Sequence, residues 1–199
     1  MGTNYTRYNR RRLGARVNNI KRTAVLAVIT LLAAAGGTLV ARAAAQPAND
    51  AKQTALLKRL FPAATAFSPK GGDPPHYKAF SGDPRAQTLL GLAYWTTELE
   101  PFERAYDGPI KILVGMDTKG MLTGVIVTEH HEPYGDFSVD RPEFAAQFRG
   151  KSIRDAFKVG ADIDAVSRAT ISVTSASRAV RNSSRRVARQ LLAPPEPAK

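Results

Sequence analysis

The part of the sequence best suited to chemistry runs from residue 164 to 191 and reads DAVSRATISVTSASRAVRNSSRRVARQL. Three hydroxyl side chains, those of Ser167, Thr170 and Ser172, fall within six positions, directly before a long helical pattern. Backbone N–H groups at a helix start lack partners within the helix, and the helix dipole is positive there, which favours a phosphate. Arg168 adds a guanidinium whose geometry suits phosphate oxygens. The residues alone leave two interpretations open: a phosphate site, or hydroxyls that cap the helix, the more common use of Ser and Thr at such a place.

The helix predicted over residues 172–192 is strongly amphipathic. At 100° per residue one stripe of its surface is apolar and the opposite side is basic. The apolar stripe predicts that the helix packs on a sheet. The basic side is either a solvated face or a docking surface for anionic lipid headgroups or an acidic partner. The stripe comprises Val173, Ala176, Val180, Val187 and Leu191, and the basic side comprises Arg178, Arg181, Arg185 and Arg189.

The segment EHHEPY, residues 129–134, contains two adjacent histidines between acidic residues. Neighbouring side chains on a strand point to opposite faces, so His130 and His131 cannot chelate one ion from regular β-structure. We therefore expect no metal site here and instead a hairpin end at which Pro133 and Tyr134 turn the chain. The sequence has no Ser-His-Asp arrangement, P-loop or Gly-x-Gly-x-x-Gly pattern, which argues against hydrolase, kinase and dinucleotide-binding functions.

After a first predicted helix, the predicted strands come before the remaining predicted helices. This order predicts an α+β fold in which an antiparallel sheet packs against C-terminal helices and positions the residues named above. Alternating and β-branched segments indicate strands, and the last two strands form the best hairpin, across a short glycine-containing turn. Helical patterns flank the strands. The predicted strands are 76–81, 87–98, 109–117 and 122–130; the predicted helices, besides the last, are 51–61, 140–150 and a shorter one at 152–160.

The positive charge is concentrated at the start of the chain. The formal net charge is +12, but residues 1–45 contain eight Lys or Arg and no acid, which leaves 21 basic and 17 acidic residues in the remainder. This distribution argues against a nucleic-acid partner. The chain has no cysteine, which excludes disulfides, thiolate zinc sites, cysteine-ligated iron–sulfur clusters and c-type haem attachment.

After the basic leader, residues 23–41 form a run of 19 residues without a charge. As a helix this run would span about 28 Å, close to a hydrocarbon core of about 30 Å. The preceding basic residues orient the N-terminus to the cytoplasm and the rest outward. A cleaved signal peptide is the alternative, because Ala43 and Ala45 provide an Ala-x-Ala site. In both cases we expect residues 46–199 on the outer side of a bacterial inner membrane, in the periplasm, either tethered by a single span or free.

The heptapeptide DAVSRAT resembles the Asp-x-x-Ser/Thr-Gly-Ala-Thr signature of the FMN-binding domain. This family occurs in subunits of the Rnf complex, in the sodium-pumping NADH:quinone oxidoreductase and in NosR-type proteins. Residues 106–133 resemble its strand–turn–strand segment, and EHHEP is closest to the NosR type, so the resemblance covers about residues 90–192. Arg168 stands where the family has glycine. The positions that match the signature are Asp164, Ser167, Ala169 and Thr170.

The resemblance implies FMN joined through its phosphate to Thr170 by a dedicated flavin transferase. It also implies that the chain is a membrane-tethered periplasmic electron carrier rather than a stand-alone enzyme. Such a carrier would exchange electrons with a redox partner in the membrane or the periplasm. NosR-type proteins are normally longer and carry cysteine-ligated clusters, so this partner would be another polypeptide. The expected phosphate and turn residues are Asp164, Ser167, Arg168, Ala169, Ile171 and Ser172, and the expected ring contacts are Glu129, His130 and Tyr134.

The charge pattern, the uncharged run and the resemblance together divide the chain. We expect a basic cytoplasmic leader and a transmembrane anchor or signal peptide, then a lead-in of helix and loop, the FMN-binding domain and a short tail. The ranges are 1–22, 23–45, 46–86, 87–193 and 194–199.

The arginine at position 168 decides between two functions. Glycine adopts positive φ easily and arginine does not. Either the turn needs no special backbone angle, which we expect because an arginine suits a phosphodiester, or the site has lost its flavin. In the second case the chain would be a flavin-free, membrane-anchored binding module of the same fold that docks a partner through its basic C-terminal helix.

Overall fold

The computed structural model describes residues 50–83 and 85–192. The predicted leader (1–22), the predicted anchor or signal peptide (23–45) and the tail (194–199) lie outside the described residues. Within the described residues, no helix is both long enough and apolar enough to cross a bilayer.

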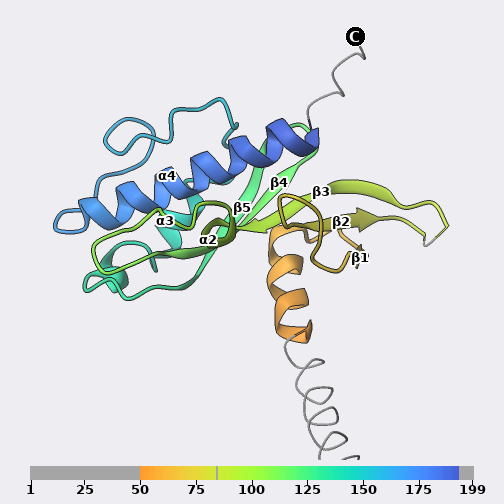
Figure 1. Ribbon diagram of the computed structural model, residues 1–199, viewed down its shortest axis with the longest axis horizontal. Coiled ribbons are helices and arrows are strands. Elements are labelled where there is room, and N and C mark those ends of the chain that lie inside the picture. Colours follow the sequence, from red (N-terminus) through yellow and green to blue (C-terminus); the bar gives the residue numbers. More distant parts are fainter. Residues whose placement is uncertain (1–49, 84, 193–199) are drawn as a thin grey trace, which may run out of the picture. The chain divides into compact units, whose positions relative to one another are not determined.

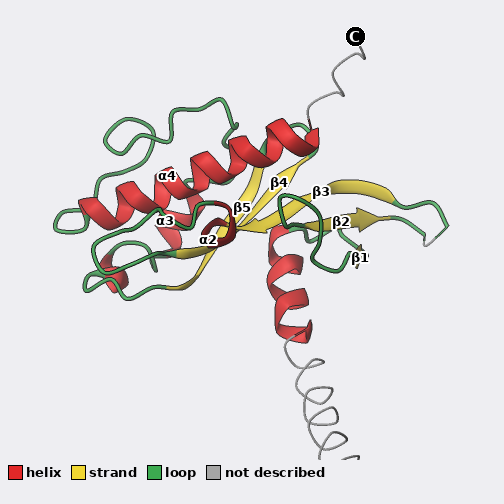
Figure 2. Ribbon diagram, viewed as in Figure 1, coloured by secondary structure: helices red, strands yellow, loops and turns green. Residues whose placement is uncertain are grey.

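The centre of the domain is a five-stranded antiparallel sheet, in which each strand pairs with the next along the chain (Figures 1 and 2). This arrangement confirms the predicted antiparallel α+β fold. The predicted strand 87–98 ends earlier than expected, because a single helical turn, α2 (Thr96–Leu99), follows it directly. The strands are β1 (Ala66–Phe67), β2 (Tyr77–Ser81), β3 (Thr88–Trp95), β4 (Lys111–Asp117) and β5 (Leu122–Glu129).

The sheet separates two apolar layers, as the alternation of side chains along a strand requires. On β3, Leu92 and Tyr94 face the layer that also contains α4 (Thr170–Val187), whereas Ala93 and Trp95 face the opposite layer. The helix over residues 50–60 contributes its apolar side chains to this second layer. The two helices therefore cover opposite faces of the same strands (Figure 1).

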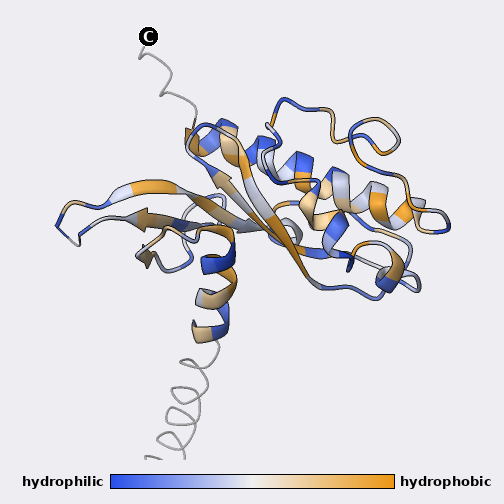
Figure 3. Cartoon of the chain, turned by 180° about the vertical axis from the view of Figure 1, so that it is seen from behind, coloured by the Kyte–Doolittle hydropathy of each residue, from blue (hydrophilic) through white to orange (hydrophobic). Residues whose placement is uncertain are grey.

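The apolar stripe of the last helix is confirmed, but the buried arc is wider than the stripe. Val173, Ala176, Val180 and Val187 are buried in the core and Leu191 is half-buried against it. Buried serines widen this arc. Several of their hydroxyls donate to the backbone carbonyl four residues earlier, and this hydrogen bond allows a polar side chain to be buried in a helix. Figure 3 shows hydrophobic and hydrophilic residues mixed along α4. The buried serines of α4 are Ser172, Ser175, Ser177, Ser183 and Ser184.

Tyr94 on β3 ties the sheet to this serine surface. Its side chain is fully buried, and its hydroxyl donates to Ser184 Oγ at 2.8 Å. Burial raises the pKa of Tyr94 far above its ordinary value, with the hydrogen bond to Ser184 acting in the opposite direction. The tyrosine therefore stays neutral and holds α4 in register with the sheet at neutral pH.

Two of the four arginines predicted to form a basic face bind groups outside α4. Arg178 pairs with Glu103, with 2.7 Å between Nη2 and the carboxylate oxygen. Arg185 donates to the carbonyl oxygens of Ile153 and Asp155, both at 2.8 Å. These arginines fix loops to the outer side of α4, so the surface left for docking is smaller than the sequence pattern indicates.

The predicted helix at 152–160 is wrong: these residues form turns. Asp162 organises them by accepting from the N–H groups of Phe157 at 3.0 Å and Lys158 at 2.6 Å and from Lys151 Nζ at 3.2 Å. Desolvation acts to raise the pKa of Asp162, but these hydrogen bonds outweigh it and hold the pKa below its ordinary value. The other predicted helix, 140–150, is shorter than expected, since α3 spans Pro142–Ala146.

Candidate functional site

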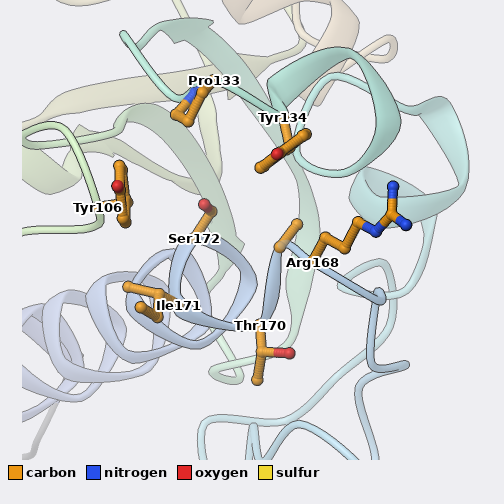
Figure 4. Close-up of a pocket in the computed structure, with 8 residues that line it drawn as sticks. Tyr106, Pro133, Tyr134, Arg168, Thr170, Ile171 and Ser172 are labelled. Carbon is orange, nitrogen blue, oxygen red and sulfur yellow. The ribbon is translucent and has the colours of Figure 1, made fainter.

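A cavity of about 480 Å³ lies at the start of α4. Its volume is within the range of about 300–1,000 Å³ typical of small-molecule and cofactor sites. Three chain segments form it: the loop before β4, the loop after β5 and the turn that leads into α4. In Figure 4, Tyr106, Pro133, Tyr134 and Ser172 lie around one space, whereas the side chains of Arg168 and Thr170 extend away from them. The lining residues are Tyr106, Pro133, Tyr134, Arg168, Ala169, Thr170, Ile171 and Ser172.

The first turn of α4 has no side-chain cap. Its N-cap residue is Ala169, which has no hydroxyl, and the first i to i−4 bond runs from the N–H of Val173 to Ala169 O at 3.0 Å. The N–H groups of Thr170, Ile171 and Ser172 precede that bond and have no acceptor within the helix. The capping interpretation of the hydroxyls is therefore wrong, and the donors of this turn are available to a ligand.

The three hydroxyls differ in their surroundings. Thr170 is exposed, and the only hydrogen bond of its Oγ1 within the described part of the chain is a long one, 3.5 Å, to Val166 O. Ser172 is buried and donates to the carboxylate of Glu132. Ser167 is exposed and lies outside the cavity lining. Of these three hydroxyls, that of Thr170 is thus the one that both lines the cavity and can be reached by an external reagent.

Arg168 has a φ of +67°, in the left-handed region. The expectation that this turn needs no special backbone angle is therefore wrong: the turn requires positive φ, and arginine adopts it here. The geometry explains why a glycine suits this position, since the left-handed conformation costs a residue with a Cβ about 1–2 kcal/mol.

Arg168→Gly is accordingly expected to stabilise the domain by about 1 kcal/mol, the relieved strain less the extra freedom of glycine in the unfolded chain. For a chain of this size, that gain corresponds to a rise in Tm of about 2–4 °C. Thermal unfolding followed by circular dichroism measures it. The matched control is Arg168→Ala, which removes the guanidinium but keeps the Cβ and should bring no gain. Equal Tm values for the two variants would contradict the strain argument.

The cavity has one polar end and apolar walls. Tyr106 is 69% exposed, Ile171 59% and Tyr134 44%, so two aromatic rings and an aliphatic side chain border open space. In Figure 4, Tyr106 and Arg168 lie at opposite ends of the group, with Ser172 and Tyr134 between them. The first-turn N–H groups and the Arg168 guanidinium are donors for an anion. This combination suits a ligand with a planar apolar ring at one end and a phosphate at the other.

Not every residue expected at the site lines the cavity. The N–H of Asp164 donates to Gln147 Oε1 at 2.7 Å, which fixes the start of the turn. Glu129 is exposed at the end of β5 and pairs with Lys111 at 3.4 Å. His130 lies 2.9 Å from Asp140 Oδ1 through its Nε2, and its Nδ1 accepts the N–H of Glu132 at 3.1 Å. These contacts shape the loops around the cavity.

Three residues at or beside the cavity, Tyr106, Pro133 and Glu132, were not among the site residues expected from the sequence. Pro133 and Glu132 belong to the EHHEP segment, whose two acids flanking adjacent histidines were a usable signal. Tyr106 stands in a turn-like segment, YDGP, and no pattern distinguishes it. Within the described residues no group of three or more His, Asp or Glu side chains could hold a metal ion.

The comparison with protein families agrees with the geometry. Residues 105–184 match the family model described as FMN-binding domain. The matched stretch contains all eight residues that line the cavity. No curated protein matches the chain.

Proposed function

We propose that this chain, whose residues 105–184 are an FMN-binding domain, carries FMN esterified to Thr170 and serves as a membrane-tethered periplasmic electron carrier of the NosR type. Flavin binding is supported by the match to the family model. The covalent bond, the electron-carrying role and the location are the proposal.

The observation that carries the proposal is the exposed Thr170 hydroxyl at the uncapped start of α4, inside a cavity of flavin-compatible size and polarity. A covalently held phosphate needs a reachable nucleophile beside anion donors. Thr170 provides the nucleophile, and the N–H groups of the first turn together with Arg168 provide the donors. The residues present therefore fit FMN.

The roles of the side chains follow from this arrangement. Thr170 Oγ1 would form the bond to phosphorus while the bond from phosphorus to its leaving group breaks, and the hydroxyl proton would pass, directly or through water, to that leaving group. The phosphate comes from an activated flavin nucleotide that already carries such a leaving group, delivered by a flavin transferase. Arg168 and the first-turn N–H groups neutralise the remaining phosphate charge, while Tyr106 and Tyr134 offer apolar surface to the ring. The bound flavin supplies the redox chemistry.

The partners follow from the chemistry of a carrier. The transferase must reach the Thr170 side chain, and its exposure supports this. A redox partner in the membrane or the periplasm must exchange electrons with the ring. The basic leader and the uncharged run at 23–41 support tethering to the membrane with the domain facing outward.

The test is to produce the full chain in a bacterial host with and without a periplasmic flavin transferase. When the transferase is present, we expect the mass of the chain to increase by that of FMN minus one water and the denatured band to fluoresce in a gel. The modified peptide should be the one that contains Thr170. Without the transferase we expect none of these signals. A colourless product of unmodified mass beside an active transferase would overturn the covalent proposal.

A further inference from the structure

Glu132 is a buried carboxylate that joins all three segments of the cavity. Glu132 is only 7% exposed. Its Oε1 accepts a hydrogen bond from the N–H of Asp107 at 2.8 Å. Its Oε2 accepts the N–H of Tyr106 at 3.2 Å and the hydroxyl of Ser172. Tyr106 and Ser172 line the cavity, and Glu132 itself lies behind its wall. The carboxylate thus fixes the loop before β4 and the loop after β5 to the first turn of α4.

The charge of Glu132 has no cationic partner. In the described part of the chain, none of the ion pairs formed by Lys, Arg or His includes this residue. Burying a carboxylate away from water is costly unless its oxygens accept hydrogen bonds. Here two backbone N–H groups and a hydroxyl stabilise the side chain without neutralising it.

Glu103 provides an internal comparison on the same helix. It also accepts from an α4 serine, Ser175, at 2.9 Å, three residues further along. Unlike Glu132, it is paired with an arginine, Arg178, at 2.7 Å. It also lies outside the cavity lining. The two carboxylates therefore anchor loops to α4 in a similar way, but only Glu132 places an unpaired charge at the cavity wall.

We infer that Glu132 is a positioning residue of the flavin site whose unpaired charge lowers the reduction potential of the bound flavin. The inference rests on the proposed function. It assigns two linked tasks to one side chain: holding the cavity walls together, and opposing the build-up of negative charge on the ring.

The electrostatic part follows from the charge balance of reduction. Two electrons and one proton convert the oxidised ring to its reduced anion, so the ring gains one net negative charge. A second negative charge within the protein wall opposes this change, and a buried charge is screened less by solvent and salt than an exposed one. Removal of the charge should therefore make reduction easier and raise the potential.

The experiment compares Glu132→Gln with Glu103→Gln in the full chain matured by the transferase. The potential is measured by spectroelectrochemical titration at pH 8, where the electrode supplies the electrons. We expect Glu132→Gln to shift the reduction equilibrium at least tenfold toward the reduced flavin, about 30 mV for a two-electron couple. Glu103→Gln should shift it less than about twofold, because Glu103 lies outside the cavity lining and the Arg178 guanidinium beside it is half exposed, so solvent and salt screen the change of charge.

Unfolding midpoints and the conservative variant Glu132→Asp distinguish an effect of the Glu132 charge from an effect of the shape of its side chain. Glu132→Gln should lower the unfolding midpoint by a few degrees, since both carboxylate oxygens accept hydrogen bonds and one of them becomes an amide nitrogen. Glu103→Gln should have a smaller effect, because the hydrogen bonds to Glu103 all end on one oxygen, which glutamine retains. Glu132→Asp keeps the charge on a shorter side chain and should retain the wild-type potential within about twofold in the equilibrium, even if its unfolding midpoint falls. If Glu132→Gln does not fold, the potential of Glu132→Asp decides the question.

Two results would overturn the inference: a potential shift in Glu132→Gln no larger than in Glu103→Gln, or a shift in Glu132→Asp as large as the one expected for Glu132→Gln. Either would reduce Glu132 to a purely structural side chain. These results are distinct from a failure of the proposed function, which would appear as wild-type protein without flavin.

Discussion

Thr170→Ala is expected to abolish covalent attachment of FMN and to leave the fold intact. Two hydroxyl residues of α4 line the cavity within the described part of the chain, and Thr170 is the exposed one. The substitution removes its hydroxyl. Ser172 cannot replace it, because its side chain is buried and its hydroxyl is committed to Glu132. Stability should change by less than about 0.5 kcal/mol, since the lost hydrogen bond to Val166 is long and alanine is a good helix former.

Intact mass and in-gel fluorescence measure this loss, after co-production with the transferase. Ser167→Ala and Ser172→Ala are the matched controls, because each removes one hydroxyl from the same segment. We expect both to retain the modification, with a lower unfolding midpoint for Ser172→Ala because Glu132 loses a donor. Full loading of Thr170→Ala, or modification mapped to Ser172, would show that the acceptor is a different side chain.

The sequence was sufficient to single out the candidate site but not to decide between its two interpretations. The spacing of Ser167, Thr170 and Ser172 before an amphipathic pattern placed three hydroxyls near a helix start. Whether a hydroxyl caps a helix depends on which residue occupies the N-cap, and helix patterns fix that boundary only within a residue or two. The structure places Ala169 there. A shift of one residue in the boundary therefore separates a capped helix from an anion site.

The same limitation applies to Arg168, since a backbone angle cannot be read from residue types. Glycine in the family signature was consistent with a left-handed angle, with close backbone approach or with neither. The φ of +67° selects the first explanation.

Local sequence patterns could not predict contacts between segments that are distant in the sequence. Glu132 contacts Tyr106 and Ser172 across 26 and 40 residues of sequence. Residues 152–160 read as helical because their apolar spacing allowed it, yet the carboxylate of Asp162 captures the N–H groups of Phe157 and Lys158. Phe157 also has a φ of +52°, which no α-helix accommodates. Tertiary hydrogen bonds thus overrode the local pattern here. The four longer strands and the last helix, with longer periodic signals, were predicted well, whereas the two-residue strand β1 (Ala66–Phe67) was missed.

Gly91→Ala is expected to be the most destabilising single-methyl change in the sheet. Gly91 lies in β3 opposite Asp117 of β4. A Cβ at this position would overlap the carbonyl oxygen of Met116 and would stand 2.9 Å from Asp117 Cα and 2.8 Å from the Phe61 ring. The first two obstacles are backbone atoms of the neighbouring strand, which cannot move without disturbing the pairing of β3 with β4. Glycine in a strand interior often marks such a close approach.

We expect a loss of about 3 kcal/mol, at the upper end of overpacking costs, and a fall in Tm of about 6–12 °C. Gly71→Ala is the matched control, because an added Cβ there would have no atom beyond its chain neighbours within 4 Å and the φ of Gly71 is not in the left-handed region. Its stability should stay within about 0.5 kcal/mol of wild type. Because Gly91 is not among the residues that line the cavity, Gly91→Ala should reduce flavin loading only as far as it unfolds the domain. Wild-type Tm in this variant would mean that β3 and β4 can separate locally at little cost, which would contradict the argument from close backbone approach.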